Sequence, residues 1–192
     1  MNDPSVLILF AHPAFSRSKI NRALVHAAHD VGGITIHDLY ETYPDFLIDV
    51  PAEQRLLEQH QHIVLQHPFY WYSSPAIIKE WLDLVLTYGW AFGQSGTALH
   101  GKTLAHSISA GGAMEDYQRG GQNHFTIREL LAPFAQTARL CGMNYAQAHV
   151  VHDSNNLNDT ELPICVQGYR HWLENLRDGN CRFWQTPSEH TE

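Results

Sequence analysis

Short apolar runs alternate five times with longer segments of helical periodicity along this chain. Val6–Phe10 is a continuous apolar run of the kind found in strands that are buried on both faces. In the next segment Ile20, Leu24 and Val31 fall on one face of a helix. Regular alternation of this kind predicts a parallel sheet covered by helices on both faces, with right-handed crossovers. The chain is therefore expected to form an α/β fold with three layers.

Five strands are expected from the apolar runs. They are Val6–Phe10, Ile34–Asp38, Ile63–Gln66, Leu104–Ser109 and Ala146–Val151. The second and the fifth interleave polar with apolar residues, which edge strands tolerate better than central ones. Placing these two strands outermost predicts the order 2-1-3-4-5. In such a sheet a ligand binds beyond the carboxyl ends of the strands, beside the point where the strand order reverses. The functional residues should therefore follow strands one, three and four.

Helices are expected between these strands and after the last one. The strongest start signal is a capping box in which Thr126 stands three residues before Glu129. Pro133, inside the same helical pattern, should kink this helix or displace its start. The length of 192 residues suits one domain, expected over residues 1–181, with a mobile tail over residues 182–192.

Charge and cysteine content narrow the class of protein. The formal net charge is −8 and no run of Lys or Arg occurs, which argues against a nucleic-acid partner. No apolar stretch approaches the roughly 20 residues needed to cross a bilayer, and the start does not read as a signal peptide. The three cysteines are far apart and odd in number, as expected of reduced thiols. These features predict a cytoplasmic protein.

The loop after the first strand collects side chains that suit a phosphate. Its candidate binding residues are His12, Ser18, Lys19, Ile20 and Asn21. They stand at a helix start, where unpaired N–H groups and the helix dipole favour an anion. The loop lacks the glycines of a nucleoside triphosphate loop or of an ordinary dinucleotide fold. A simple helix cap by Ser16 or Ser18 would explain the same residues equally well.

The loops after the third and fourth strands complete the candidate site. The third carries Pro68, Phe69, Tyr70, Trp71, Tyr72 and Ser73. Four successive aromatic side chains cannot all enter one core, so some should line a cleft for a flat heterocycle. The alternative is that they are core or dimer-contact residues. The fourth loop reads Ser109, Ala110, Gly111, Gly112, Ala113. Paired glycines let the backbone approach a ligand closely, although they also suit a simple turn.

Two other functional classes are not favoured by the sequence. Fourteen histidines suggest a metal site, but His60 with His62, or His26 with His29, has no third ligand at a suitable spacing. We expect no metal centre. Ser107 lies near histidines without the Gly-x-Ser-x-Gly turn of a hydrolase.

With these loops the sequence resembles the NAD(P)H:quinone oxidoreductase family of flavodoxin-like proteins. The nearest branch is bacterial and holds stand-alone NAD(P)H oxidoreductases and ancillary subunits of glutathione-regulated potassium-efflux systems. The likeness runs from about Val6 to about Gly142. Its most telling segments are Ala11-His12-Pro13 with Ser18 and Asn21, His37–Tyr40 with Tyr43–Asp45, Gln66–Pro68 through Lys79–Asp83, and Tyr88–Gly93.

The resemblance implies a flavodoxin-like fold, bound FMN and NAD(P)H as co-substrate. It implies that the loop after the first strand holds the flavin phosphate, that residues 70–73 lie along the ring, and that Ser109–Ala113 reach its pyrimidine end. Tyr117 and His124 are the implied catalytic residues. Trp90 and Phe92 match a segment that reaches the partner's pocket in the family, which implies a homodimer. The chain is too short for the larger FAD-binding members, so FMN is favoured over FAD.

Three functions remain open from the sequence. The leading one is FMN-dependent two-electron reduction of quinones or similar acceptors, with ping-pong kinetics. The alternative is a regulatory flavoprotein subunit of a glutathione-gated potassium-efflux system, peripheral to the inner membrane. The third is a one-electron carrier of the flavodoxin type.

Overall fold

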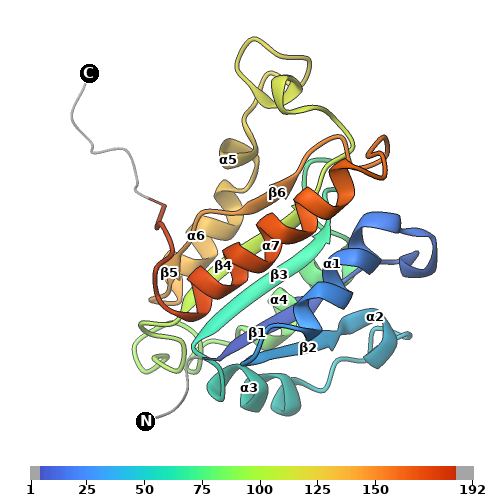
Figure 1. Ribbon diagram of the computed structural model, residues 1–192. Coiled ribbons are helices and arrows are strands. Elements are labelled where there is room, and N and C mark those ends of the chain that lie inside the picture. Colours follow the sequence, from blue (N-terminus) through green and yellow to red (C-terminus); the bar gives the residue numbers. More distant parts are fainter. Residues whose placement is uncertain (1–4, 185–192) are drawn as a thin grey trace.

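A computed structural model describes residues 5–184 and shows a sheet with helices on both faces (Figure 1). All strand pairs within the sheet are parallel. The strands are β1 (Val6–Phe10), β2 (Ile34–Asp38), β3 (His62–Pro68), β4 (Thr103–Ser109), β5 (Asn144–Tyr145) and β6 (His149–Val151). Their order is β2-β1-β3-β4-β5, with β6 also pairing with β4. The predicted fold class and strand order are confirmed.

The alternation of side chains along the central strands divides the core into two clusters. Ile8 and Phe10 of β1 pack toward one face, whereas Leu7 and Leu9 pack toward the other. The first face is covered by α1 (Lys19–His29) and α7 (Glu161–Arg177), which lie in front of the sheet in Figure 1. The second face is covered by α2 (Leu39–Thr42), α3 (Val50–Glu58), α4 (Ala76–Val85), α5 (Ile127–Leu130) and α6 (Ala132–Leu140). Two short 3₁₀ helices, η1 (Phe15–Arg17) and η2 (Met114–Tyr117), lie in the loops after β1 and β4.

The outermost position beside β4 differs from the prediction. One strand over Ala146–Val151 was expected, but two short strands, β5 and β6, share this position. Ala146 still donates to the Leu104 carbonyl, at 2.9 Å, before the chain leaves the ladder. The next N–H, of Gln147, donates instead to the Arg182 carbonyl, at 2.8 Å. Hydrogen bonding to the C-terminal segment therefore interrupts the strand.

That C-terminal segment also differs from the mobile tail expected over residues 182–192. Phe183 forms an antiparallel bridge with Ala146, and the Trp184 N–H donates to the Tyr145 carbonyl at 2.7 Å. Arg128 lies over the Trp184 ring, 4.6 Å from its centroid. Residues 182–184 are thus fixed to the sheet edge, because β5 leaves backbone groups there for them to pair with. Residues 185–192 lie outside the described residues.

The helix predicted from the capping box is present in two pieces. Thr126 Oγ1 accepts from the Glu129 N–H at 3.1 Å, and the Glu129 carboxylate accepts from the Thr126 N–H at 2.9 Å. Pro133 stands in the first turn of α6, where a missing N–H costs little. The proline therefore separates α5 from α6, as expected. Within residues 5–184, none of the helices has the length and apolar character required to span a membrane.

Candidate functional site

A cleft of about 590 Å³ opens at the carboxyl ends of the strands. It is bordered by the loops after β1, β3, β4 and β6, so segments far apart in the sequence meet at one rim. The predicted residues that line it are His12, Ser18, Lys19, Ile20, Asn21, Pro68, Phe69, Tyr70, Trp71, Ser109 and Gly111. Tyr72, Ser73, Ala110, Gly112 and Ala113 lie in the same loops without lining the cleft itself. The predicted loops therefore converge on one cleft.

Hydrogen bonds order the end of the cleft at α1. Ser18 caps α1, and its Oγ accepts from the Asn21 backbone N–H at 3.2 Å. Asn21 Nδ2 donates to Ser18 Oγ at 3.1 Å and to Ser109 Oγ at 2.9 Å, which joins the loops after β1 and β4. The first-turn N–H groups of Lys19 and Ile20 have no acceptor within the helix. Ser18 is thus a cap that also stands at a site suited to an anion.

His12 lies beside this end of the cleft as a neutral ring. Its Nδ1 accepts from the Ala14 N–H at 3.1 Å, which places the ring proton on Nε2. Burial lowers the pKa of His12 below its ordinary value. The imidazole can therefore donate a hydrogen bond to an anion without carrying a full charge.

A tight turn follows β3. The Ser73 N–H donates to the Tyr70 carbonyl at 3.0 Å, and the two residues form an antiparallel bridge. The residues between them, Trp71 and Tyr72, have φ of 49° and 64°, in the left-handed region that favours glycine. Trp71 is 92% exposed and Tyr72 is 47% exposed. A left-handed conformation at two aromatic residues is strained, and such strain collects at ligand sites.

Only part of the backbone after β4 is free to donate. The Ala110 N–H donates to the Val151 carbonyl at 2.8 Å, and the Ala113 N–H donates to Asp116 Oδ2 at 2.9 Å. The donors that remain for a ligand are those of Gly111 and Gly112. A Cβ added at Gly111 would lie 3.1 Å from Asn155 Nδ2, so glycine keeps this passage open. The loop offers fewer donors than the sequence suggested, because the N–H groups of Ala110 and Ala113 already donate to Val151 and Asp116.

The two predicted catalytic residues have different surroundings. Tyr117 is 7% exposed, and its ring lies 6.1 Å from that of Phe69 and 5.7 Å from that of His152. Burial raises the pKa of Tyr117, so the hydroxyl stays protonated. His124 is exposed and has φ of 60°.

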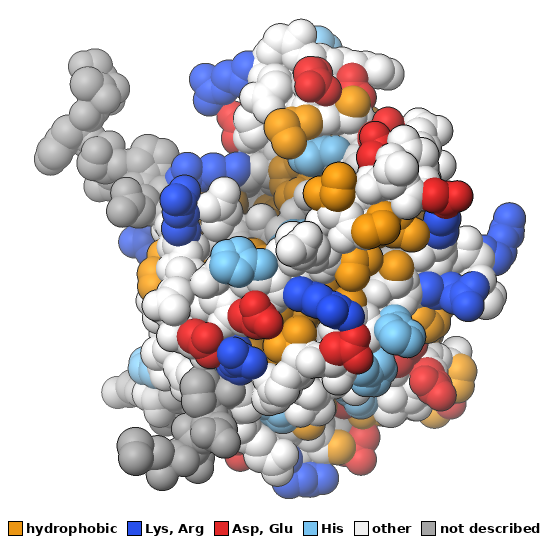
Figure 2. All heavy atoms as spheres, in the orientation of Figure 1, with side chains coloured by type: hydrophobic (Ala, Val, Ile, Leu, Met, Phe, Trp, Pro, Cys, Tyr) orange, Lys and Arg blue, Asp and Glu red, His pale blue; other side chains and the backbone are white. Residues whose placement is uncertain are grey.

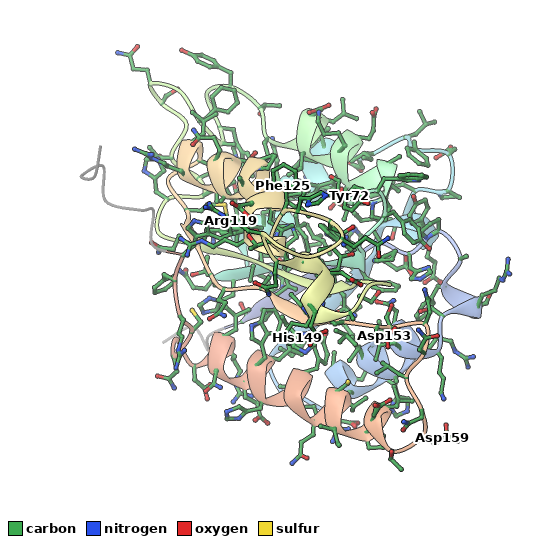
Figure 3. All side chains as sticks on the ribbon, turned by 90° about the horizontal axis from the view of Figure 1, so that it is seen from above. Tyr72, Arg119, Phe125, His149, Asp153 and Asp159 are labelled. Atoms are coloured by element: carbon green, nitrogen blue, oxygen red, sulfur yellow. The ribbon has the colours of Figure 1, made fainter. Side chains whose placement is uncertain are left out.

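The loop that carries His124 reaches the turn after β3. Tyr72 Oη donates to Asn123 Oδ1 at 3.2 Å. Figure 3, which labels Tyr72 and Phe125, shows this loop from above. The contact brings the segment between η2 and α5 beside the aromatic turn.

Trp90 and Phe92 lie away from the cleft of their own chain. They follow α4 and precede β4, at the amino ends of the strands. Trp90 Nε1 donates to Glu58 Oε1 at 3.0 Å, and the Phe92 ring lies 5.7 Å from that of Tyr88. Their predicted role in the pocket of a partner subunit therefore stays a prediction.

A fourth loop was missed by the sequence analysis. Ser154 and Asn155, which follow β6, and Arg17 of η1 also line the cleft. The Asp153 N–H donates to the Gly112 carbonyl at 2.9 Å, which ties the two loops together. The run from Asp153 to Asn156 begins two residues after the end of the predicted fifth strand, and such residues favour turns. This signal could have identified the loop.

Buried histidines are grouped near β4, but they do not form a metal site. The rings of His67 and His106 lie 5.5 Å apart, and His106 Nδ1 lies 2.8 Å from Tyr145 Oη. Among residues 5–184, no group of three or more His, Cys, Asp or Glu could hold a metal ion.

The sequence was compared with protein families and known relatives. The family model described as flavodoxin-like fold matches residues 4–174. The NAD(P)H oxidoreductase YrkL of Bacillus subtilis (strain 168) is 45% identical over 156 residues, which cover 81% of this chain and 90% of that protein. The potassium-efflux ancillary protein KefG of Pectobacterium atrosepticum is 43% identical over 170 residues, covering 88% of this chain and 93% of that protein.

Solved structures give the same result. General stress protein 14 of Treponema denticola, in complex with FMN, is 38% identical with a TM-score of 0.86, and the match covers 90% of this chain and 99% of that chain. An NADPH-quinone reductase from P. pentosaceus is 33% identical with a TM-score of 0.80, covering 88% and 96%. Sequence, architecture and the position of the cleft agree, and the chain belongs to the flavodoxin-like family.

Proposed function

We propose that this protein is an FMN-dependent NAD(P)H oxidoreductase that reduces quinones or similar electrophilic acceptors and acts as a homodimer. The observation that carries the proposal is the meeting of the three predicted loops at one cleft. The names of the relatives support it, since they include an NAD(P)H oxidoreductase and an NADPH-quinone reductase. The FMN complex of a protein with 38% identity supports the choice of cofactor.

The residues of the cleft fit a phosphorylated flavin. The helix start at Ser18 offers free N–H groups together with the neutral donor His12, as a phosphate requires. Asn21 Oδ1 is buried and has no partner among the described residues, so a polar ligand group or a water can complete it. At the other end, Tyr70 and Trp71 offer flat faces to a ring, and glycines give the backbone access.

The chemistry that FMN supplies when bound is two-electron transfer from NAD(P)H to the acceptor, in a ping-pong cycle. Ser18, His12 and the first-turn N–H groups of Lys19 and Ile20 would hold the phosphate, and Asn21 would position Ser18 and Ser109 beside it. The N–H groups of Gly111 and Gly112 would stabilise negative charge at the polar edge of the ring; one such donor is typically worth about 3 kcal/mol. Tyr117, held protonated by its surroundings, donates a hydrogen bond or a proton to the acceptor oxygen, and His124 assists it.

Absorbance and turnover of the purified protein test the proposal. We expect a yellow protein that retains flavin through gel filtration and oxidises NAD(P)H steadily with a benzoquinone. A colourless protein that takes up no added FMN would refute the cofactor assignment. Sedimentation should give twice the monomer mass, and Trp90→Ala should lower turnover while flavin stays bound if the segment reaches the partner's pocket.

The similarity to KefG favours a second candidate function, regulation of a membrane potassium-efflux protein. Flavin binding without turnover, together with co-purification with such a protein, would support this alternative. Accumulation of one-electron-reduced flavin with little NAD(P)H oxidation would instead support an electron carrier.

A further inference from the structure

A second groove adjoins the cleft along the outer side of α1. It is about 640 Å³ in volume and shares Arg17, Ser18 and Lys19 with the cleft. Figure 2 shows Lys, Arg and His side chains beside apolar ones on the right-hand side of the molecule, where α1 lies. A ligand longer than one nucleotide could therefore extend from the cleft into this groove.

The charge of the groove is opposite to that of the whole protein. Its lining contains Arg17, Lys19 and Arg22 and, within the described part of the chain, neither Asp nor Glu. The chain as a whole has a formal charge of −8. A surface with three cations in an acidic protein attracts an anionic ligand by its local field.

Two of the three cations are available to a ligand. Lys19 is paired with Asp159 at 2.8 Å, so its charge is partly compensated. Arg17 and Arg22 make no side-chain hydrogen bond or ion pair with any residue between 5 and 184. Guanidinium groups bind phosphate oxygens in a bidentate manner, which gives them selectivity for a phosphate.

Flat surfaces complete the groove. Phe15 lines it, with its ring centroid 4.8 Å from that of Phe10, which holds the ring in place. His26 and His29, one helical turn apart and both exposed, also line it. Aromatic and imidazole rings next to arginines suit an adenine base that carries a phosphate.

We propose that this groove binds the phosphorylated adenosine of the hydride donor and thereby makes NADPH the preferred donor over NADH. The inference rests on the proposed function, since the donor must reach the cleft. NADPH differs from NADH only in its 2′-phosphate. Arginines accommodate that group, whereas an acidic side chain would bind the free 2′-hydroxyl of NADH. The groove has the arginines and lacks the acid.

Kinetics with the flavin-loaded protein test the proposal. The ratio of kcat/KM for NADPH to that for NADH should be about tenfold or more, the size expected of one charge-assisted contact. Arg22→Ala should lower this ratio about tenfold, mainly through the KM for NADPH. Arg22 lines the groove and not the cleft, so flavin content is measured alongside to confirm that the fold is intact. Arg55→Ala, at an exposed arginine on α3 that makes no side-chain hydrogen bond or ion pair within residues 5–184, is the matched control and should leave the ratio unchanged.

Binding without turnover separates this proposal from the proposed function. The flavin-loaded protein should bind 2′,5′-ADP more tightly than 5′-AMP by calorimetry, and Arg22→Ala should remove the difference. Equal affinities, or equal kcat/KM for both dinucleotides in a protein that turns over, would overturn the groove assignment and leave the oxidoreductase assignment standing. A protein that binds 2′,5′-ADP selectively but oxidises neither dinucleotide would overturn the oxidoreductase assignment. It would leave standing only the binding of a phosphorylated adenosine in the groove. Released flavin should be FMN; FAD would mean that the adenylate of the cofactor fills the groove, which also overturns the proposal.

Discussion

The two ends of the cleft are organised in different ways. At the α1 end, Asn21 is 1% exposed and joins Ser18 to Ser109 by hydrogen bonds. At the β3 end, Trp71 is 92% exposed and stands in a turn with a left-handed backbone. The α1 end is fixed by side chains that are already hydrogen-bonded to one another. The β3 end is fixed by a strained main chain whose side chains are exposed to solvent.

This difference indicates how the affinity for a ligand is divided between the two ends of the cleft. A preorganised polar end binds an anion without paying the entropy of ordering side chains. An exposed aromatic turn gains contacts only when a ligand covers it. We therefore expect substitutions at the α1 end to abolish cofactor binding and substitutions at the β3 end only to weaken it. Four measurements test this difference between the two ends.

The largest effect is expected from Asn21→Ala. It removes the link between two loops and leaves the buried Ser109 hydroxyl without its partner, at about 1–3 kcal/mol. FMN affinity, measured by fluorescence titration of apoprotein, should fall about 100-fold. Asn180→Ala, at an exposed asparagine after α7, is the control. An affinity within about threefold of wild type would show that the α1 end is not the main determinant of FMN binding.

Lowering the pH is expected to destabilise the folded protein through His67, at the β3 end of the cleft. His67 precedes Pro68, its Nδ1 lies 3.0 Å from the Pro68 carbonyl, and burial lowers its pKa to about 4. An unfolded histidine titrates near 6.5. Since the folded pKa is the lower one, the unfolded state binds the proton first. Stability is then full above about pH 6.5 and falls toward pH 4, by up to about 1.4 kcal/mol per pH unit for this group.

Urea unfolding between pH 7.5 and 4.5 measures this loss. His67→Gln should flatten the slope by about one proton. The same slope in His67→Gln and wild type would assign the acid sensitivity to other buried histidines, such as His149.

A smaller effect is expected from Tyr117→Phe. The variant keeps the ring contacts with Phe69 and His152 and removes only the hydroxyl. We expect kcat with a quinone to fall about tenfold, a modest general-acid contribution. Stopped-flow reduction of the flavin by NADPH should be unchanged, because that half-reaction does not use the hydroxyl. Equal slowing of both half-reactions would assign Tyr117 to positioning rather than to proton donation.

The smallest effect is expected from Trp71. Trp71→Ala should weaken FMN binding about fivefold, by loss of one exposed aromatic contact worth about 1 kcal/mol. Trp71→Gly should weaken binding similarly but raise the free energy of unfolding by about 1 kcal/mol, since glycine relieves the left-handed strain. Unchanged FMN retention in both variants would remove Trp71 from the site. Leu47→Ala, at a leucine that is 76% exposed, controls for loss of an exposed apolar side chain.

The fold and most of the cleft could be read from local patterns. The five apolar runs located the sheet positions, and the capping box at Thr126 with Pro133 located α5 and α6. The polar loop at Ser18 and the aromatic segment after β3 identified two walls of the cleft. Each of these features depends on residues within a few positions of each other, and such periodicity and capping are local properties.

Other features could not be read in this way because they depend on contacts over a long separation in sequence. The split of the last strand depends on Arg182 and Phe183 pairing with Gln147 and Ala146. The use of the Ala113 N–H by Asp116 reduced the donors at the glycine loop. The place of Ser154 and Asn155 in the cleft follows from the position of β6.

Local patterns in the sequence were enough to predict the layered α/β architecture, the strand order and the edge of the sheet that carries the ligand loops. The folded chain was needed to show which polar groups are already paired, which backbone donors remain for a ligand, and that a basic groove continues from the cleft along α1. The physical reason is that burial patterns repeat along the chain, whereas a hydrogen bond between Asn21 and Ser109 exists only once the sheet has brought the two loops together.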